Sequence, residues 1–174
     1  MINVTDWTGL KVFLEHEEFS MLHGTVEDYS RVLDFKEGAV RRTLIWTSPQ
    51  GRRAKVMFER FISQANRHLA FLRCTVQPLN FSGAVIIRSH VNGSVRNYHH
   101  LREPALEVTS VKHTNESGVI VSQTKRSGFA VACAVTHQAK PAASIMGSAS
   151  NTCLDFLARF EAQEGQDIVF DKFV

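Results

Sequence analysis

Alternation between apolar and polar side chains along short runs constrains the fold of this chain more than any other feature. Successive side chains of a β-strand point to opposite faces, so a period of two predicts strands rather than helices. The runs lie at 29–35, 40–47, 56–62, 70–76, 85–87, 106–108, 119–121, 129–135, 154–160 and 168–170. Roughly ten such runs with turn residues between them predict an all-β fold, an antiparallel sandwich or barrel.

The connection between the second and third runs has the residues of a tight turn. Ser48-Pro49-Gln50-Gly51 places proline at the second position and glycine at the fourth, which favours a type I turn. Two strand-like runs on either side of such a turn predict a β-hairpin.

Two segments interrupt the alternation. Asn92–Pro104 is polar and long for a hairpin loop, and long loops are often functional. Gln138–Asn151 is rich in small residues and weakly patterned, which predicts a loop or linker between strands.

Composition narrows the class of protein. A chain of 174 residues that is 44% hydrophobic and 21% charged fits one large globular domain. No apolar run approaches the ~20 residues of a membrane span, and the N-terminus lacks the pattern of a secretory signal. The three cysteines lie in apolar runs, as expected of buried thiols in a reducing compartment, so we expect a cytoplasmic protein. A net charge of +3 gives no argument for nucleic acid.

Carboxylates are the first candidates for catalysis, because cleavage of a glycosidic bond needs a carboxylic acid and commonly a second carboxylate. The sequence predicts a surface turn for Glu17-Glu18, an ion-paired or solvated strand position for Glu59, and a solvent-facing position for Asp155. Neither these residues nor Glu103 and Glu107 have a sequence neighbour that would raise the pKa of the carboxyl group. We therefore assign no catalytic residue.

Histidines offer a second kind of chemistry within the 92–104 loop. Neighbouring strand residues point to opposite faces, so His99 and His100 do not form a metal pair, and no His-x-His or Cys-x-x-Cys spacing predicts zinc. A contact of this loop with sugar or with a neighbouring domain stays open. Its candidate residues are Asn92, Asn97, Tyr98, His99 and His100.

Several other motifs favour structural roles. The arginines at 41, 42, 52, 53, 60 and 67 are interspersed with acidic residues on alternating faces, which predicts an ion-paired sheet surface rather than a phosphate track. Gly147–Ser150 lacks the Lys-Ser/Thr ending of a phosphate-binding loop. We expect Ser63 to stabilise a turn, His68 to be packed, and Trp46 to lie in the core or an interface.

The strand-rich first half also carries a family resemblance. The residues are Tyr29-x-Arg31-x-Leu33-Asp34, Gly38 with Arg42, Trp46, Gly51, and Arg60-Phe61-x-Ser63 leading to His68. They resemble the N-terminal domain of glycoside hydrolase family 65, which includes maltose, trehalose and kojibiose phosphorylases and some hydrolases. The resemblance weakens in the second half, and Phe35 and Asn66 depart from the usual pattern.

The resemblance implies a β-supersandwich of the galactose-mutarotase type, with residues 1–174 as one N-terminal domain. It implies that a catalytic α/α-toroid lies in a later part of such a polypeptide, outside these residues, and holds the general acid. The implied reaction is inverting phosphorolysis of an α-glucosidic disaccharide, or hydrolysis, with inorganic phosphate as co-substrate of the former. No metal or organic cofactor is implied.

Three hypotheses follow. The leading one is a non-catalytic domain that packs on the catalytic domain of the same polypeptide, sends the 92–104 loop toward the rim of the active site, and helps to form a homodimer. The second is an autonomous carbohydrate-binding module. The third is a mutarotase-like enzyme, which would need a glutamate and histidines in one cleft.

Overall fold

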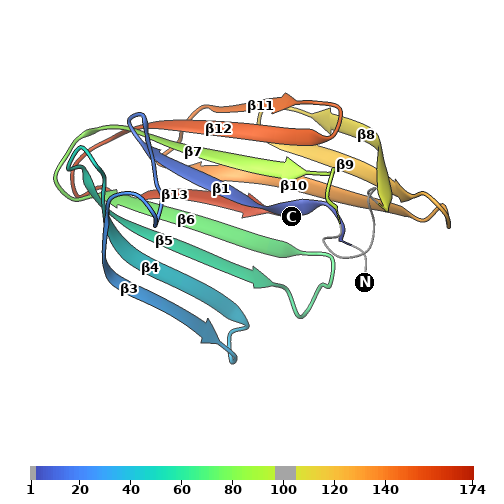
Figure 1. Ribbon diagram of the computed structural model, residues 1–174, viewed down its shortest axis with the longest axis horizontal. Helices are drawn as coiled ribbons and strands as arrows, with labels where there is room; N and C mark the ends of the chain where they lie inside the picture. Colours follow the sequence, from blue (N-terminus) through green and yellow to red (C-terminus); the bar gives the residue numbers. More distant parts are fainter. Residues whose placement is uncertain (1–2, 97–104) are drawn as a thin grey trace.

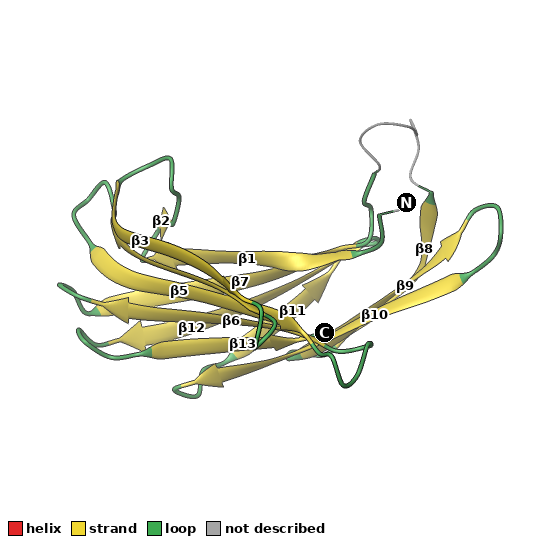
Figure 2. Cartoon of the chain, turned by 90° about the horizontal axis from the view of Figure 1, so that it is seen from below, coloured by secondary structure: helices red, strands yellow, loops and turns green. Residues whose placement is uncertain are grey.

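A computed structural model describes residues 3–96 and 105–174, which form strands and turns but no helix. The strands build two antiparallel sheets (Figures 1 and 2). The small sheet has the order β11 (Ile145–Ala149), β12 (Cys153–Ala162), β7 (Gly83–Asn92), β1 (Asp6–Leu14), β2 (Glu17–Glu18). The large sheet has the order β3 (Thr25–Asp34), β4 (Ala39–Thr47), β5 (Arg53–Ile62), β6 (Ala70–Pro78), β13 (Ile168–Phe173), β10 (Ala130–Lys140), β9 (Ser117–Thr124), β8 (Leu106–His113). The all-β antiparallel sandwich is thus confirmed.

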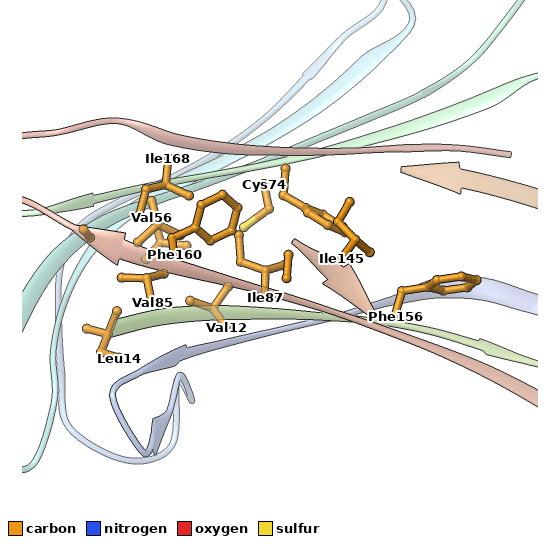
Figure 3. Packing of buried hydrophobic residues seen from close by; sticks show 14 of the residues in the cluster. Val12, Leu14, Val56, Cys74, Val85, Ile87, Ile145, Phe156, Phe160 and Ile168 are labelled. Carbon is orange, nitrogen blue, oxygen red and sulfur yellow. The ribbon is translucent and has the colours of Figure 1, made fainter. Parts of the chain in front are cut away.

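The core lies between the two sheets. Every second residue of β12 is buried, from Leu154 to Ala162, and the same alternation holds along β13 and along β6 from Leu72 to Pro78. Figure 3 shows side chains of the large sheet facing those of the small sheet: Val56, Cys74 and Ile168 opposite Val85, Ile87 and Phe160. Each fully buried aliphatic or aromatic side chain stabilises the fold by about 1.5–3 kcal/mol.

The hairpin predicted around the 48–51 turn is confirmed. The Gly51 amide donates to the Ser48 carbonyl across 2.9 Å, and Gly51 has a φ of 84°. β4 and β5 pair along their whole length, from Ala39 opposite Phe61 to Thr47 opposite Arg53. Trp46 lies in the core as expected, with its indole Nε1 donating to the His23 carbonyl.

The loop predicted for Gln138–Asn151 is wrong in part. β10 continues to Lys140, and residues 145–149 form β11, which pairs with β12. The small side chains that hide the strand pattern have a packing reason at Gly147. A Cβ atom there would lie 2.2 Å from the Thr114 carbonyl oxygen and 3.2 Å from the Phe156 ring.

The large sheet has more strands than the small one and extends beyond it. In Figure 1, β3, β4 and β5 fan out past the edge of the small sheet. β3 is consequently exposed on both faces, and a bulge between Glu27 and Ser30 interrupts its register with β4. The structure therefore leaves the inner surface of β3–β5 open at one end only, around Arg31, Arg42 and Arg60, because Leu44, Trp46 and Val56 are buried. Within the described ranges no helix is long and apolar enough to cross a membrane.

Candidate functional site

Glu17 was expected in a surface turn, and this expectation is wrong. The residue lies in β2 with its side chain 9% exposed, and it joins the small sheet to the β4–β5 turn. Its carboxylate accepts from Ser48 Oγ at 2.6 Å, from Arg52 Nη1 at 2.7 Å and from the Gln50 amide at 3.0 Å. Burial raises the pKa of Glu17, but these hydrogen bonds outweigh it and hold the pKa below its ordinary value. A carboxylate kept ionised in this way does not serve as a general acid.

The other carboxylates singled out from the sequence are also engaged or exposed. Glu59 is ion-paired with Arg41, as expected. Asp155 faces outward from β12 and pairs with Arg88 at 2.7 Å and His90 at 3.0 Å, which hold its pKa low against the opposing effect of burial. Glu107 is exposed on β8 and Glu103 lies outside the described residues. The described part of the chain holds no group of three or more histidine, cysteine, aspartate or glutamate residues that could bind a metal.

The long loop after β7 is described only at its two ends. Asn92 is the last residue of β7, and its side-chain oxygen accepts from the Ser94 amide at 2.8 Å and contacts Cys153 Sγ at 3.5 Å. Asn97, Tyr98, His99 and His100 lie outside the described residues. The contact of this loop with sugar or a second domain therefore stays a prediction.

A buried histidine and a buried hydroxyl, His137 and Ser89, are in contact in the interior, and sequence reasoning did not single them out. His137 Nε2 lies 2.9 Å from Ser89 Oγ, and Nδ1 donates to the Glu116 carbonyl at 2.9 Å. The imidazole packs against the rings of Phe156 and Phe170, with centroids at 4.4 and 5.3 Å. Burial lowers the pKa of His137 to about 4, so the ring is neutral and accepts from the Ser89 hydroxyl.

This pair has the atoms of a nucleophile and its base, but its surroundings exclude that role. Ser89 is 0% exposed and His137 is 2% exposed, so no substrate reaches the hydroxyl. His137 Nδ1 donates its hydrogen bond to a backbone carbonyl, whereas in a Ser-His-Asp site this nitrogen donates to a carboxylate. The contact instead ties β10 of the large sheet to β7 of the small sheet.

Lys172 is a second buried polar side chain that sequence reasoning missed. It follows the buried Ile168 and Phe170 at the same spacing in β13 and is itself 0% exposed. Its Nζ donates to the His90 carbonyl of β7 at 3.0 Å, and burial lowers the pKa of Lys172 to about 8. Residues 168, 170 and 172 lie on the same face of the strand, so the alternation predicts that the Lys172 side chain points inward.

The arginine-rich segment is confirmed as ion-paired at several positions. Arg41 pairs with Glu37 and Glu59, Arg52 pairs with Glu17, and Arg53 pairs with Glu27. The Ser63 hydroxyl accepts from the Asn66 amide at 3.0 Å and stabilises the 63–69 turn, as expected. His68 was expected to be packed, but it is exposed, because this turn projects beyond the sheet.

A row of rings forms an apolar feature on the outer face of the large sheet. Phe61 of β5, Phe71 of β6 and Phe173 of β13 lie opposite one another in register, and side chains directly opposite share a face. Their ring centroids are 5.1 and 5.2 Å apart. Arg73, paired with Asp171, lies over the Phe71 ring with its guanidinium carbon 5.4 Å from the centroid. We call Phe61, Phe71 and Phe173 the aromatic row.

An apolar groove continues the aromatic row toward β10 and β9. The groove has a volume of about 550 Å³, and its lining includes Leu69, Phe173, Ala134 and Val119. Leu69 is 51% exposed and Phe61 37% exposed, although both lie on a surface of mainly apolar character. Apolar grooves of this size occur at surfaces that bind another protein element or domain.

Comparison with known proteins agrees with the resemblance seen in the first half of the chain. The family model described as "Glycosyl hydrolase family 65, N-terminal domain" matches residues 1–174. An α,α-trehalose phosphorylase of Thermoanaerobacter brockii is 31% identical over 185 residues, covering 100% of this chain and 24% of the relative. A kojibiose phosphorylase of Halothermothrix orenii is 39% identical over 95 residues, covering 55% of this chain and 12% of the relative.

A solved structure shares the fold. It is described as a kojibiose phosphorylase from the human microbiome, with a TM-score of 0.85 and 12% identity, and the match covers 99% of this chain and 22% of that one. The chain thus spans about a quarter or less of the length of these relatives. The whole-chain match of the family model, together with the two-sheet sandwich, shows that this chain belongs to the N-terminal domain family of the family 65 glycosyl hydrolases.

Proposed function

We propose that this chain is the non-catalytic N-terminal domain of a disaccharide phosphorylase. The observation that carries the proposal is the match of the family 65 N-terminal domain to all 174 residues, with phosphorylases among the relatives. The parent enzyme would cleave an α-glucosidic disaccharide with inorganic phosphate, with inversion, to release β-glucose 1-phosphate. The engaged or exposed state of the described candidate carboxylates supports a catalytic acid located elsewhere in the polypeptide.

The same proposal gives the outer face of the large sheet a role. The aromatic row and the adjoining apolar groove would pack against the catalytic domain, because burying them removes apolar surface from water. The loop from Asn92 to Pro104 would extend toward the rim of the active site. Its charged and aromatic composition suits contact with a sugar or with the partner domain.

Activity assays test the catalytic part of the proposal. The isolated chain is compared with a fusion in which it replaces the matched N-terminal segment of the Thermoanaerobacter brockii trehalose phosphorylase; we call this protein the phosphorylase fusion. Each is incubated with phosphate and either α,α-trehalose or kojibiose, and β-glucose 1-phosphate is measured. We expect release only from the fusion. Release by the isolated chain above the buffer blank would overturn the non-catalytic assignment.

Cysteine labelling tests the packing. Ala134 lines the apolar groove and is exposed on β10, whereas Glu161 is exposed on the small sheet. We expect an Ala134→Cys thiol to react with maleimide in the isolated chain and to be protected in the phosphorylase fusion, while Glu161→Cys reacts in both. Labelled peptides are identified by mass so that the three native cysteines do not interfere. Equal labelling of Ala134→Cys in both proteins would contradict packing through this face.

A further inference from the structure

A groove on the inner face of the large sheet, distinct from the apolar groove, has the features of an anion site. It has a volume of about 250 Å³ and lies where β3, β4 and β5 extend beyond the small sheet. In Figure 1 these strands lie on the side of β1 away from β7, beyond β6, and β1 contributes Thr8 and Leu10 to the lining. Four arginines also line it: Arg31 of β3, Arg42 of β4, Arg60 of β5, and Arg73 of β6, which is paired with Asp171. We call it the arginine groove.

The strand register places the side chains of three of these arginines, Arg31, Arg42 and Arg60, on one face. Arg42 has the same parity as the buried Leu44 and Trp46, so its side chain points to the inner face of the sheet. Arg31 lies directly opposite Arg42 and therefore shares that face. Arg60 has the same parity as the buried Val56, so its side chain also points to the inner face. It lies opposite Val40, which is the next inward-facing residue of β4 before Arg42.

Arg31, Arg42 and Arg60 differ from the other arginines of the two sheets because they have no carboxylate partner among the described residues. Every other strand arginine that the structure describes has a carboxylate within 3.1 Å, namely Arg41, Arg53, Arg73, Arg88 and Arg159. Within residues 3–96 and 105–174, no carboxylate pairs with Arg31, Arg42 or Arg60. Glu59, an acidic residue of the lining, has the opposite parity to Arg60, and its carboxylate pairs with Arg41.

The arrangement also carries a cost that a bound anion would offset. Like charges directly opposite each other on neighbouring strands destabilise a sheet, and Arg31 and Arg42 are such a pair. Arg42 is nevertheless held in place, because its guanidinium carbon lies 4.5 Å from the centroid of the Phe58 ring. A guanidinium fixed on an aromatic face is ready to bind an oxyanion with little loss of conformational freedom.

The size and lining of the groove indicate the class of ligand. Guanidinium groups match the geometry of phosphate oxygens, and a phosphate monoester carries nearly two charges at pH 7. The apolar side chains of Leu10, Val40 and Leu72 and the ring of Phe58 provide a surface for the C–H groups of a sugar. A volume of about 250 Å³ lies below the ~300–1,000 Å³ of typical ligand pockets, so the groove suits one sugar ring rather than an oligosaccharide.

We propose that the arginine groove binds a phosphorylated monosaccharide, with the phosphate on Arg31, Arg42 and Arg60 and the sugar on the apolar lining. The choice of glucose 1-phosphate as the probe rests on the proposed function, because this is the product of the proposed parent reaction. The site itself rests on the groove and on Arg31, Arg42 and Arg60, the three arginines of its lining that have no carboxylate partner among the described residues. Occupancy of the arginine groove would therefore rise with the concentration of the reaction product, although this domain does not catalyse the reaction.

Calorimetric titration of the 174-residue chain with glucose 1-phosphate tests the proposal. We expect saturable binding at least 10-fold tighter than that of inorganic phosphate, and no binding of glucose. Arg31→Gln and Arg60→Gln each remove one guanidinium from an exposed position and should weaken binding about 10-fold. Arg67→Gln is the matched control, because Arg67 is an exposed arginine in the 63–69 turn, outside the arginine groove.

Each other outcome has a defined meaning. No saturable binding of glucose 1-phosphate, or equal weakening by Arg67→Gln, would overturn the site. Phosphate binding as tight as glucose 1-phosphate would overturn the sugar as part of the ligand. Because the titration uses the isolated chain and no catalysis, its failure leaves the phosphorolysis assay unaffected, and failure of that assay does not change the titration.

Discussion

His137 makes the stability of this chain depend on pH. Its pKa is about 4 in the folded chain and 6.5 when the group is unperturbed, so between these values the unfolded chain takes up a proton that the folded chain does not. The stabilising effect of the neutral, buried ring is fully present above pH 6.5 and is lost as the pH falls toward 4. This pKa difference lowers the free energy of unfolding by about 3 kcal/mol once the pH has fallen to about 4. Lys172 titrates above this window and contributes little to it.

We therefore expect the free energy of unfolding to fall by about 3 kcal/mol between pH 7 and pH 4 because of His137 alone. Urea unfolding at several pH values measures it. His137→Gln should be less stable at pH 7 but should lose this part of the pH dependence, and His68→Gln, at an exposed position, should behave as the unmodified chain. A His137→Gln chain with the full slope would show that other groups cause it.

These two buried residues also show the limit of reading single positions from a pattern. Period-two spacing correctly gives the inward direction of His137, after Val135, and of Lys172, after Phe170. The spacing does not identify the hydrogen-bond partners that offset the cost of burying these two polar side chains. Those are Ser89 and the His90 carbonyl of β7, which lie 48 and 82 positions away along the chain.

At the scale of elements, the β2 strand is connected to the β4–β5 turn by one carboxylate. Glu17 accepts hydrogen bonds from Ser48, Gln50 and Arg52, whereas its neighbour Glu18 pairs with Lys11 at a position about half exposed. The two residues are adjacent and chemically identical. Their environments therefore provide a matched comparison of a buried and a surface ion pair.

Glu17→Gln is expected to lower the free energy of unfolding by about 1–3 kcal/mol, because the amide removes the charge that pairs with Arg52 and replaces one of the two acceptor oxygens by a donor. Glu18→Gln should cost less than about 1 kcal/mol, as is usual for an exposed pair. Denaturant unfolding at pH 7 compares the two variants. Equal losses would show that Glu17 contributes no more than a surface charge.

Strands were predicted best where apolar and polar residues alternate regularly. They were missed where close packing requires small residues that hide the alternation. The strands β4, β5, β6, β12 and β13 were predicted from their alternating apolar residues. β11 was missed because Gly147 must be small to approach the Thr114 carbonyl. β1 was also missed, although Leu10, Val12 and Leu14 alternate there; the bulge between Asp6 and Gly9 disturbs the period only near its start.

At the scale of the whole molecule, the division into two sheets was beyond sequence reasoning. β1 pairs with β7, and β6 with β13, across long separations in the chain, and local alternation is the same whichever strand lies alongside. The position of the candidate surfaces follows from this topology. Phe61, Phe71 and Phe173 become one aromatic row only because β13 lies next to β6.

The aromatic row gives a prediction that compares the isolated chain with the longer polypeptide. Phe61 is 37% exposed, so Phe61→Ser removes only part of its packing in the isolated chain and should cost about 1–2 kcal/mol. In the phosphorylase fusion the proposed contact with the catalytic domain buries the rest of the ring, so the same change should cost at least about 1 kcal/mol more. Phe35→Ser is the matched control, since Phe35 is 88% exposed and lies outside the row, and it should cost little in either protein. Unfolding in urea measures both pairs, and an equal cost of Phe61→Ser in the two proteins would place the interdomain contact on another face of the sandwich.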